Sequence, residues 1–459
     1  MQRPWALLAL MVWPGIGGDA LALGISPKDP HYFQHDGQTV VLVGCSDRSA
    51  LFIWESDKGF HWREYLRDIA GAGLNYVRQD VCAWSDLDTP AGYPGQFSSP
   101  AWPFLRPGPG TAADGLPRFD LTRPDPAFFA DRLRPFLDEA ARLGIFVELT
   151  LFDQTNARNF GANLFSDENN VNDLGVGPRD VFGPSATANA RLWEAQRAYI
   201  GSVVEATQDY DHIIYEVANE TGSAEWVAAV VDLVHELRPG ALVSAGEQSS
   251  NYDVHAGKND IVIKHRGTGG WYDSDEDVKR HHDSLLDFRV GKPVIHNEFF
   301  LYANRSTDDP NFVRKMMWGD VVAGGHVNFY DFRFWRGTGR TAQEGDPSQA
   351  PPDEILRAGG ILLEFLKRHS IDLAGLQPDD SLVRSDEGIA FAMGGEPGLL
   401  AYALGASRVE LQTDARRAIA LHTATGGEGT VDLRALGGGW REGALPAGWT
   451  EAAVWAPAP

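Results

Sequence analysis

Short apolar runs alternate with amphipathic segments along most of this chain. Eight of the runs suit β-strands, because they are short, rich in Val, Ile, Leu and Phe, and bounded by polar residues or glycine. Most are separated by segments with helical periodicity, such as Arg191 to Gln208. Strands that alternate with helices form a parallel sheet, and eight such units predict a closed (β/α)8 TIM barrel. The predicted strands are 39–43, 74–78, 145–152, 212–220, 241–245, 260–265, 293–298 and 326–332.

The pattern changes at both ends of the chain. From about residue 371, short runs such as 388–393 and 399–404 are separated by Gly-rich turns, which predicts a small C-terminal all-β sandwich domain. At the start, Trp5 to Val12 is an apolar run too short to span a bilayer, and an Ala-Leu-Ala cleavage pattern ends at Ala22. We therefore expect a signal peptide at 1–22, a barrel at 23–370 and a β-sandwich at 371–459. The mature protein is expected to be periplasmic or extracellular.

Two predicted strands end in an Asn-Glu pair. Asn219-Glu220 closes the fourth strand, and Asn297-Glu298 closes the seventh. The carboxyl ends of barrel strands carry the active site in enzymes of this fold. Two carboxyl groups that flank one bond are what glycoside hydrolysis requires, since one protonates the leaving oxygen and the other attacks the anomeric carbon or activates water. Among 63 acidic residues one such glutamate is weak evidence, whereas two in the same pattern are stronger.

These motifs resemble the retaining glycoside hydrolases of clan A, which includes the cellulase-like family 5. The resemblance implies that Glu220 is the acid/base, that Glu298 is the nucleophile, and that Asn219 binds the sugar 2-hydroxyl. By position it also assigns Arg78 to keep the nucleophile ionised and His265 to line the site. The aromatic floor beneath the reactive sugar is assigned to Trp335, or less strongly to Tyr330. A narrower resemblance is to the apiosidase-like hydrolases. It rests on the Asp36-Gly37 turn, the Val-Leu-Val-Gly run that ends at Gly44, Asp47, and the C-terminal β-domain.

The supporting residues also have structural interpretations. Arg78 is alternatively an ion-pair partner, His265 an ordinary surface histidine and Trp335 a core aromatic. The three loop residues Asp47, Trp54 and Asp153 either bind sugar hydroxyls or only cap helices and fill gaps.

His296 stands two residues before Glu298 and is therefore expected to point the same way along the strand. Because no second His or Cys lies at ligand spacing in the sequence, we expect no metal site there and no cofactor. The tract His281-His282 falls on a predicted helix and is expected to be solvated.

Composition narrows the partners and the environment. The net charge of −23 argues against nucleic acid or an anionic membrane, because both require basic patches. The 14 Trp and 23 Phe suit sugar rings, although they equally fill cores. Cys45 and Cys82 follow adjacent predicted strands in a chain expected to be exported, so a single disulfide is predicted, with free buried thiols as the alternative.

The long segments 84–126 and 153–186 follow strands two and three and are expected to wall a substrate cleft. The sequence thus predicts a secreted retaining glycoside hydrolase acting on an oligo- or polysaccharide, without membrane insertion. The alternative is a non-catalytic carbohydrate-binding or adhesion protein on a degenerate barrel. A peptidase has little support, since neither H-E-x-x-H nor G-x-S-x-G is present.

Overall fold

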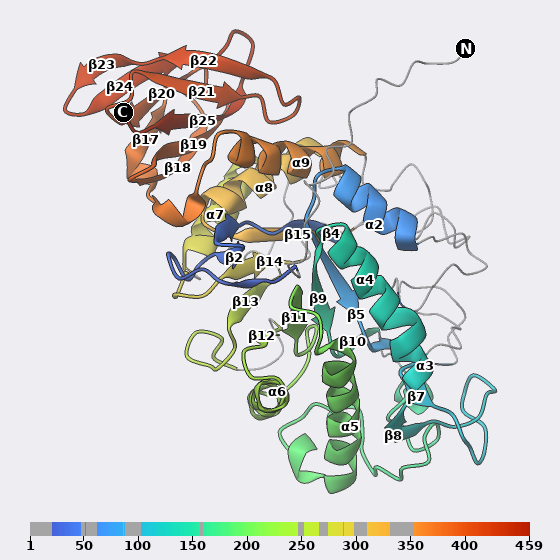
Figure 1. Cartoon of the computed structure of the whole chain (residues 1–459). Helices are drawn as coiled ribbons and strands as arrows, with labels where there is room; N and C mark the ends of the chain where they lie inside the picture. Colours follow the sequence, from blue (N-terminus) through green and yellow to red (C-terminus); the bar gives the residue numbers. More distant parts are fainter. Residues whose placement is uncertain are drawn as a thin grey trace, which may run out of the picture.

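Eight parallel strands close into a barrel, and antiparallel sheets follow at the C-terminal end of the chain (Figure 1). This arrangement confirms the predicted fold class. The computed structural model describes residues 21–46, 51, 62–85, 87, 102–156, 159–246, 252–265, 274–287, 289–297, 310–330 and 353–459. Across these residues no helix is both long and apolar enough to cross a bilayer.

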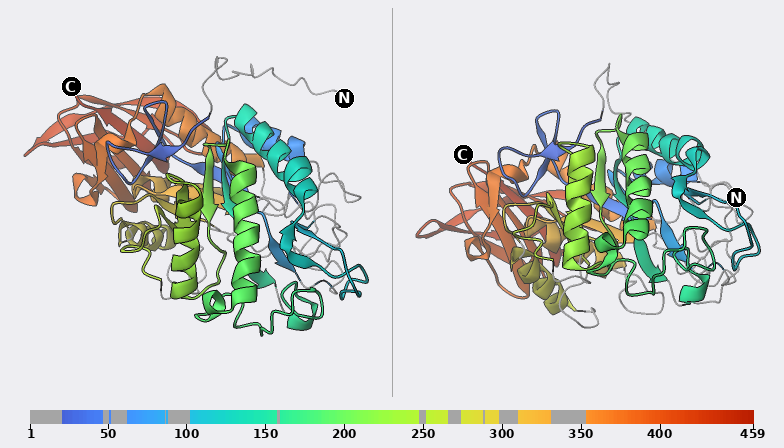
Figure 2. Two further views of the ribbon diagram at one scale, coloured as in Figure 1. Left: turned by 60° about the horizontal axis from the view of Figure 1, so that its bottom comes forward. Right: turned by 90° about the horizontal axis from the view of Figure 1, so that it is seen from below.

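The barrel strands match the predicted runs closely from the second strand onward. Figure 2 shows the helices arranged around the strands. Side chains of the strands alternate between the barrel interior and an outer layer against the helices, as period-two alternation in a closed sheet requires. In chain order the strands are β4 (Val43–Ser46), β5 (Tyr76–Asp80), β9 (Phe146–Thr150), β11 (Ile213–Glu216), β12 (Leu242–Ala245), β13 (Ile261–Lys264), β14 (Val294–His296) and β15 (His326–Tyr330).

Helices cover the outside of the barrel, and the helix predicted at 191–208 is present at Ala190–Thr207. Their buried faces, such as Tyr65, Leu66 and Ile69 of the first one, pack on the outside of the barrel. The helices are α2 (Trp62–Gly71), α3 (Pro126–Phe128) with the π-helical turn η1 (Phe129–Leu133) and α4 (Arg134–Arg142), α5 (Ala190–Thr207), α6 (Ala224–Leu237), α7 (Asp275–Asp287), α8 (Pro310–Val322) and α9 (Asp353–Arg368).

The first predicted strand, 39–43, is divided between two sheets. Its start belongs to β3 (Gln38–Val40), which pairs with β2 (Phe33–His35) across the predicted turn, and β2 also pairs with β1 (Gly24–Ile25). The chain then continues into the barrel as β4. Apolar side chains of this small sheet, including Phe33, share a core cluster with the first residues of several barrel strands. The N-terminal sheet therefore seals the amino-terminal end of the barrel.

Gly44 lies inside β4, whereas the sequence pattern placed the strand end there. A Cβ atom at this position would sit 2.2 Å from the carbonyl oxygen of Tyr76 on the neighbouring strand. The glycine thus permits a close approach of β4 and β5 rather than ending a strand.

Each of the two long segments carries short elements that order it. The first contains β6 (Ala83–Ser85), β7 (Phe104–Leu105) and β8 (Asp120–Pro124); the second contains β10 (Asp153–Asn156) and the 3₁₀ turns η2 (Phe160–Ala162) and η3 (Ala186–Ala188). β6 and β10 pair in parallel, and β7 pairs with β8. A bridge between Phe119 and Asn170 joins the segments, and the buried amide of Asn170 donates to the carbonyls of Leu164 and Ser166. The two segments therefore form one connected layer.

Two antiparallel sheets make up the C-terminal region. Side chains from both, such as Val409 and Val454, form a single apolar cluster between them, so the sheets face one another as a sandwich does. One sheet has the order β16 (Leu376–Pro378), β18 (Ile389–Gly395), β19 (Gly398–Leu404), β25 (Glu451–Pro457), β21 (Arg417–Leu421) and β22 (Glu428–Asp432). The other has the order β17 (Val383–Ser385), β20 (Arg408–Gln412), β24 (Trp440–Ala444) and β23 (Arg434–Gly437).

The six-stranded sheet packs directly on helices of the barrel (Figure 1). Trp318 of α8 stacks on Tyr402 of β19 with ring centroids 5.8 Å apart. Arg314 of α8 holds Glu451 of β25 through two hydrogen bonds of 2.9 and 2.6 Å. Both pairs are largely or fully buried, and residues of the two regions belong to one continuous apolar cluster.

The predicted disulfide is wrong. Cys45 and Cys82 both lie in the described part of the chain, where each is a buried thiol and no disulfide joins them. Strand alternation explains the result: Ser46 faces the barrel interior and bonds Asn328, so Cys45 faces outward into the apolar layer under the helices. Burial raises the pKa of Cys82 well above its usual value, which keeps this thiol protonated and unreactive.

Candidate active site

A fully buried ion pair crosses the barrel interior between the second and fourth strands. Arg78 of β5 donates from Nε to Oε2 of Glu216 on β11 at 2.8 Å, and from Nη2 to Oε1 at 2.6 Å. Both side chains have 0 % exposed surface. Thr150 of β9 adds a third donor to Glu216, from Oγ1 to Oε2 at 2.5 Å. The forked guanidinium matches the two carboxylate oxygens, which fixes both side chains.

A second buried carboxyl group, Glu148 of β9, lies beside this pair. It accepts hydrogen bonds from Tyr76 at 2.5 Å, Ser244 at 3.0 Å and Asn297 at 2.8 Å. Arg78 lies farther away, with Nε 3.8 Å from Oε2 of Glu148. Burial raises the pKa of Glu148, and the negative charge of Glu216 adds to this effect against the opposing charge of Arg78. One guanidinium thus stands between two carboxyl groups, which favours the protonated form of Glu148.

Asn219 is locked in place just beyond β11. Its backbone N–H donates to the carbonyl of Phe152 at 2.8 Å. Its side-chain Oδ1 accepts from Nη2 of Arg78 at 2.8 Å, and Nδ2 donates to Oδ1 of Asp153 at 3.3 Å. Asn219 and Asp153 are both buried. The buried ion pair therefore orients the asparagine that precedes Glu220.

Glu220 differs from the two buried glutamates. Its side chain is 27 % exposed. Its backbone has a φ of 47°, in the left-handed region that residues other than glycine rarely adopt. Its Oε1 lies 3.4 Å from Nδ1 of His265, which is fully buried at the end of β13. A strained backbone that turns a carboxyl group toward solvent beside a fixed imidazole is characteristic of functional sites.

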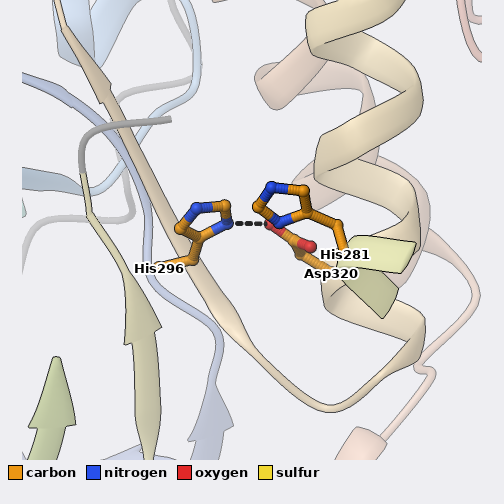
Figure 3. Close-up of side chains that lie close together, drawn as sticks. All are labelled: His281, His296 and Asp320. Atoms are coloured by element: carbon orange, nitrogen blue, oxygen red, sulfur yellow. Dashed lines mark hydrogen bonds and ion pairs between the residues drawn. The ribbon is translucent and has the colours of Figure 1, made fainter. Parts of the chain in front are cut away.

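His296 contacts the outer helices rather than the residues around Glu220. Its Nδ1 lies 2.6 Å from Oδ2 of Asp320 on α8, and its Nε2 lies 2.8 Å from the carbonyl oxygen of His265. Figure 3 shows the ring between β14 and the helices, with His281 beside it. The expectation that His296 lines the substrate site is therefore corrected: it supports the backbone of His265 from behind.

The predicted solvation of His281-His282 is also wrong. The exposed fractions of these residues are 1 % and 0 %. His282 stacks on Phe391 of β18, with centroids 4.1 Å apart, because the C-terminal sheet covers this face of α7. His281 stacks on His296, with centroids 4.7 Å apart. A second histidine therefore does lie near His296, although 15 residues separate them in sequence.

Several predicted site residues lie outside the described part of the chain. Asn297, which directly precedes Glu298, is described: it is buried, and its N–H donates to the carbonyl of Lys264 at 2.8 Å, so the pairing of β14 with β13 extends to it. Tyr330 ends β15, but its side chain is not among those described. The residues outside are Asp47, Trp54, Glu298 and Trp335.

Sequence reasoning assigned no role to Glu148 or Glu216. The signal was nevertheless present: each is a lone charge within an otherwise apolar strand, and Arg78 is a third such charge on a neighbouring predicted strand. A charge that the strand pattern forces inside a barrel must be paired there. The polar residues that complete the network are Tyr76, Thr150, Ser244, Asn297 and Asn328.

No protein-family model matches the sequence, and no curated protein matches it. Solved structures share its fold. A Bacteroides vulgatus protein described as a candidate glycoside hydrolase aligns over 96 % of this chain and 83 % of its own, with a TM-score of 0.67 and 15 % identity. A glycoside hydrolase family 5 protein from the same organism aligns over 95 % of this chain and 93 % of its own, with a TM-score of 0.62 and 15 % identity.

A glycoside hydrolase family 5 mannosidase from Rhizomucor miehei aligns over 77 % of this chain and 100 % of its own, with a TM-score of 0.53 and 16 % identity. The two B. vulgatus proteins therefore match both regions of this chain, whereas the mannosidase matches a smaller share of it. At these identities the likeness is one of fold, and function must be argued from the site.

Proposed function

We propose that this chain is a retaining glycoside hydrolase in which Glu220 is the acid/base and Glu298 is the nucleophile. The observation that carries the proposal is the pairing of a partly exposed Glu220 with the locked Asn219 just beyond the fourth barrel strand. The structural likeness to glycoside hydrolases supports the same class of activity. The proposed substrate is an oligo- or polysaccharide, and the proposed setting is the periplasm or the extracellular space after removal of residues 1–22.

The first step needs a proton donor and an ionised nucleophile. Glu220 donates its proton to the glycosidic oxygen while the Glu298 carboxylate attacks the anomeric carbon and forms a glycosyl ester. The leaving group departs as an alcohol. Glu220, now ionised, takes a proton from water, and the resulting hydroxide oxygen attacks the same carbon and releases Glu298. Two inversions give net retention of configuration.

The locked amide of Asn219 suits recognition of a sugar hydroxyl. Its oxygen already accepts from Arg78, and one of its two N–H groups points to Asp153. We propose that the second N–H donates to the sugar 2-hydroxyl. Because Arg78 and Asp153 hold the amide from both sides, the side chain of Asn219 loses little conformational freedom when a substrate binds.

A screen of aryl glycosides, including mannosides, and of plant, bacterial and algal polysaccharides tests the proposal. We expect hydrolysis of at least one substrate, with initial retention of anomeric configuration by NMR. Glu298→Gln should abolish most turnover, and Glu220→Gln should lower it about 10²–10⁴-fold. Glu220→Gln should keep part of the first step on substrates with a good leaving group, because that step then needs little acid help.

Glu225→Gln is a matched control, since Glu225 is exposed at the start of α6 and should not affect turnover. Initial inversion of configuration, or near wild-type activity of Glu298→Gln, would refute the mechanism. Binding of a sugar without turnover would instead support the alternative of a carbohydrate-binding protein on a degenerate barrel.

A further inference from the structure

Three side chains from three different elements meet in the layer between the barrel and its helices. They are His281 of α7, His296 of β14 and Asp320 of α8 (Figure 3). One potential ligand atom from each lies within 4.8 Å of the others, and all three residues are buried. We propose that this cluster binds a divalent transition-metal ion, and that Zn²⁺ fits it best. This site is separate from Glu220 and does not depend on the proposed hydrolase activity.

Hydrogen bonding around His296 requires a proton or a metal ion between it and Asp320. The carbonyl oxygen of His265 can only accept, so the 2.8 Å contact requires a proton on Nε2 of His296. In the neutral ring the other nitrogen, Nδ1, then carries a lone pair. This lone pair faces Oδ2 of Asp320 at 2.6 Å. Two lone pairs at that distance repel unless a proton or a metal ion stands between them.

Asp320 provides a second, independent indication. Its Oδ2 faces His296, whereas its Oδ1 is buried and has no hydrogen-bond partner among the described residues. A buried carboxylate oxygen without a donor is unfavourable, because it has lost its water and gained nothing in return. A proton shared with His296 satisfies only Oδ2, whereas a metal ion neutralises the whole carboxylate and carries a bound water that can donate to Oδ1.

The donor set and its spacing suit a tetrahedral ion. Two imidazole nitrogens and one carboxylate oxygen are common Zn²⁺ ligands, with a water as the fourth. Bonds of roughly 2.0–2.1 Å at tetrahedral angles put ligand atoms about 3.3 Å apart. The observed separations, from 2.6 Å between His296 and Asp320 to at most 4.8 Å within the cluster, bracket that value. We expect side-chain rotation to bring the ligand atoms to that separation when the ion binds.

The partner of His296 also follows the usual arrangement around metal sites. A ligating histidine typically donates its other N–H to a backbone carbonyl or a carboxylate, which fixes the ring and its tautomer. His296 does this through Nε2 to His265. An ion bound here would link α7, α8 and β14 next to His265, whose side chain contacts Glu220. Its expected contribution is to stability rather than to a chemical step.

The experiment uses the full chain without a polyhistidine tag. The protein is treated with a chelator, dialysed into metal-free buffer, and supplied with ZnCl₂. Inductively coupled plasma mass spectrometry after dialysis should find one Zn²⁺ per chain, and the melting temperature should rise with added ZnCl₂. Co²⁺ in place of Zn²⁺ should give the strong visible absorption of a four-coordinate site.

His281→Asn and Asp320→Asn should each lower Zn²⁺ affinity by about 100-fold or more and remove the Zn²⁺-dependent rise in melting temperature. His235→Asn is the matched control. His235 also contacts an aspartate, Asp260, at 3.0 Å, but it is not part of the cluster of His281, His296 and Asp320, so Zn²⁺ binding should be unchanged. Absence of retained Zn²⁺ and Co²⁺ in the wild-type protein would overturn the proposal and leave a proton between His296 and Asp320. Unchanged retention in both cluster variants would place the ion elsewhere and overturn it as well.

Discussion

Removal of the guanidinium of Arg78 should destabilise the barrel strongly. The side chain is fully buried, and it neutralises Glu216 through two hydrogen bonds. In Arg78→Met, Glu216 is left as a buried carboxylate without a cation, which costs about 3–5 kcal/mol of unfolding free energy. Arg78→Lys keeps the charge but cannot reproduce the fork, so it should lose about 1.5–3 kcal/mol, comparable with one hydrogen bond to a charged group.

A double variant separates the charge effect from lost packing. In Arg78→Met with Glu216→Gln the uncompensated charge is gone, so the pair should be less destabilised than Arg78→Met alone. The two substitutions should therefore be strongly non-additive, with a coupling of about 2–3 kcal/mol. Urea denaturation followed by circular dichroism and tryptophan fluorescence measures both values.

An exposed ion pair in the C-terminal region serves as the control. Arg434 contacts Glu442 at 2.7 Å, but 74 % of its side chain is exposed. Arg434→Met should therefore change the unfolding free energy by less than about 1 kcal/mol. The reasoning fails if Arg78→Met loses less than about 1 kcal/mol, or if adding Glu216→Gln recovers nothing.

Three further predictions concern other parts of the chain. Gly44→Ala should destabilise the fold or prevent folding, because the new Cβ would lie 2.2 Å from the carbonyl oxygen of Tyr76. Gly37→Ala is the control, because a Cβ there meets nothing within 4 Å and adds only the strain of a positive φ. The midpoints of urea denaturation compare the two variants. Stability should fall with acid because of His326, whose pKa burial lowers to about 3 and whose Nδ1 accepts from the N–H of Leu42. The unfolded chain binds this proton below about pH 6.5 and the native chain does not, so this group should lower stability by about 1.6 kcal/mol between pH 6.5 and 5, and His326→Gln should remove that part of the slope. Alkylation without reductant should label no cysteine in the native protein and two after denaturation; a mass with no label after denaturation would show a disulfide and contradict the structure.

The barrel could be predicted because its signal is local. Apolar runs and helical periodicity depend on neighbouring residues only, and they located seven of the eight barrel strands. The Asn219-Glu220 pair could likewise be read as a strand end with a carboxylate. The first strand was misplaced at Gly44, because the reason for a glycine there is the carbonyl of Tyr76 on another strand.

The polar networks could not be predicted because their members are far apart in sequence. Arg78 and Glu216 are 138 residues apart, and only barrel closure makes them partners. His281, His296 and Asp320 meet through the packing of two helices against one strand, which no spacing rule describes. The same packing explains the buried His282, since the sheet that covers it begins about 90 residues later in the chain than α7.

The docking of the C-terminal sheets on α7, α8 and α9 limits how this chain can be recombined. If the chain is cut after α9, Trp318 loses the aromatic ring that covers it and Arg314 loses the carboxylate that pairs with it, so an apolar surface of α8 becomes exposed to water. A chimaera that exchanges only residues beyond 370 would therefore inherit a mismatched interface. An exchange that preserves this interface must carry the helices and the sheets that face them together.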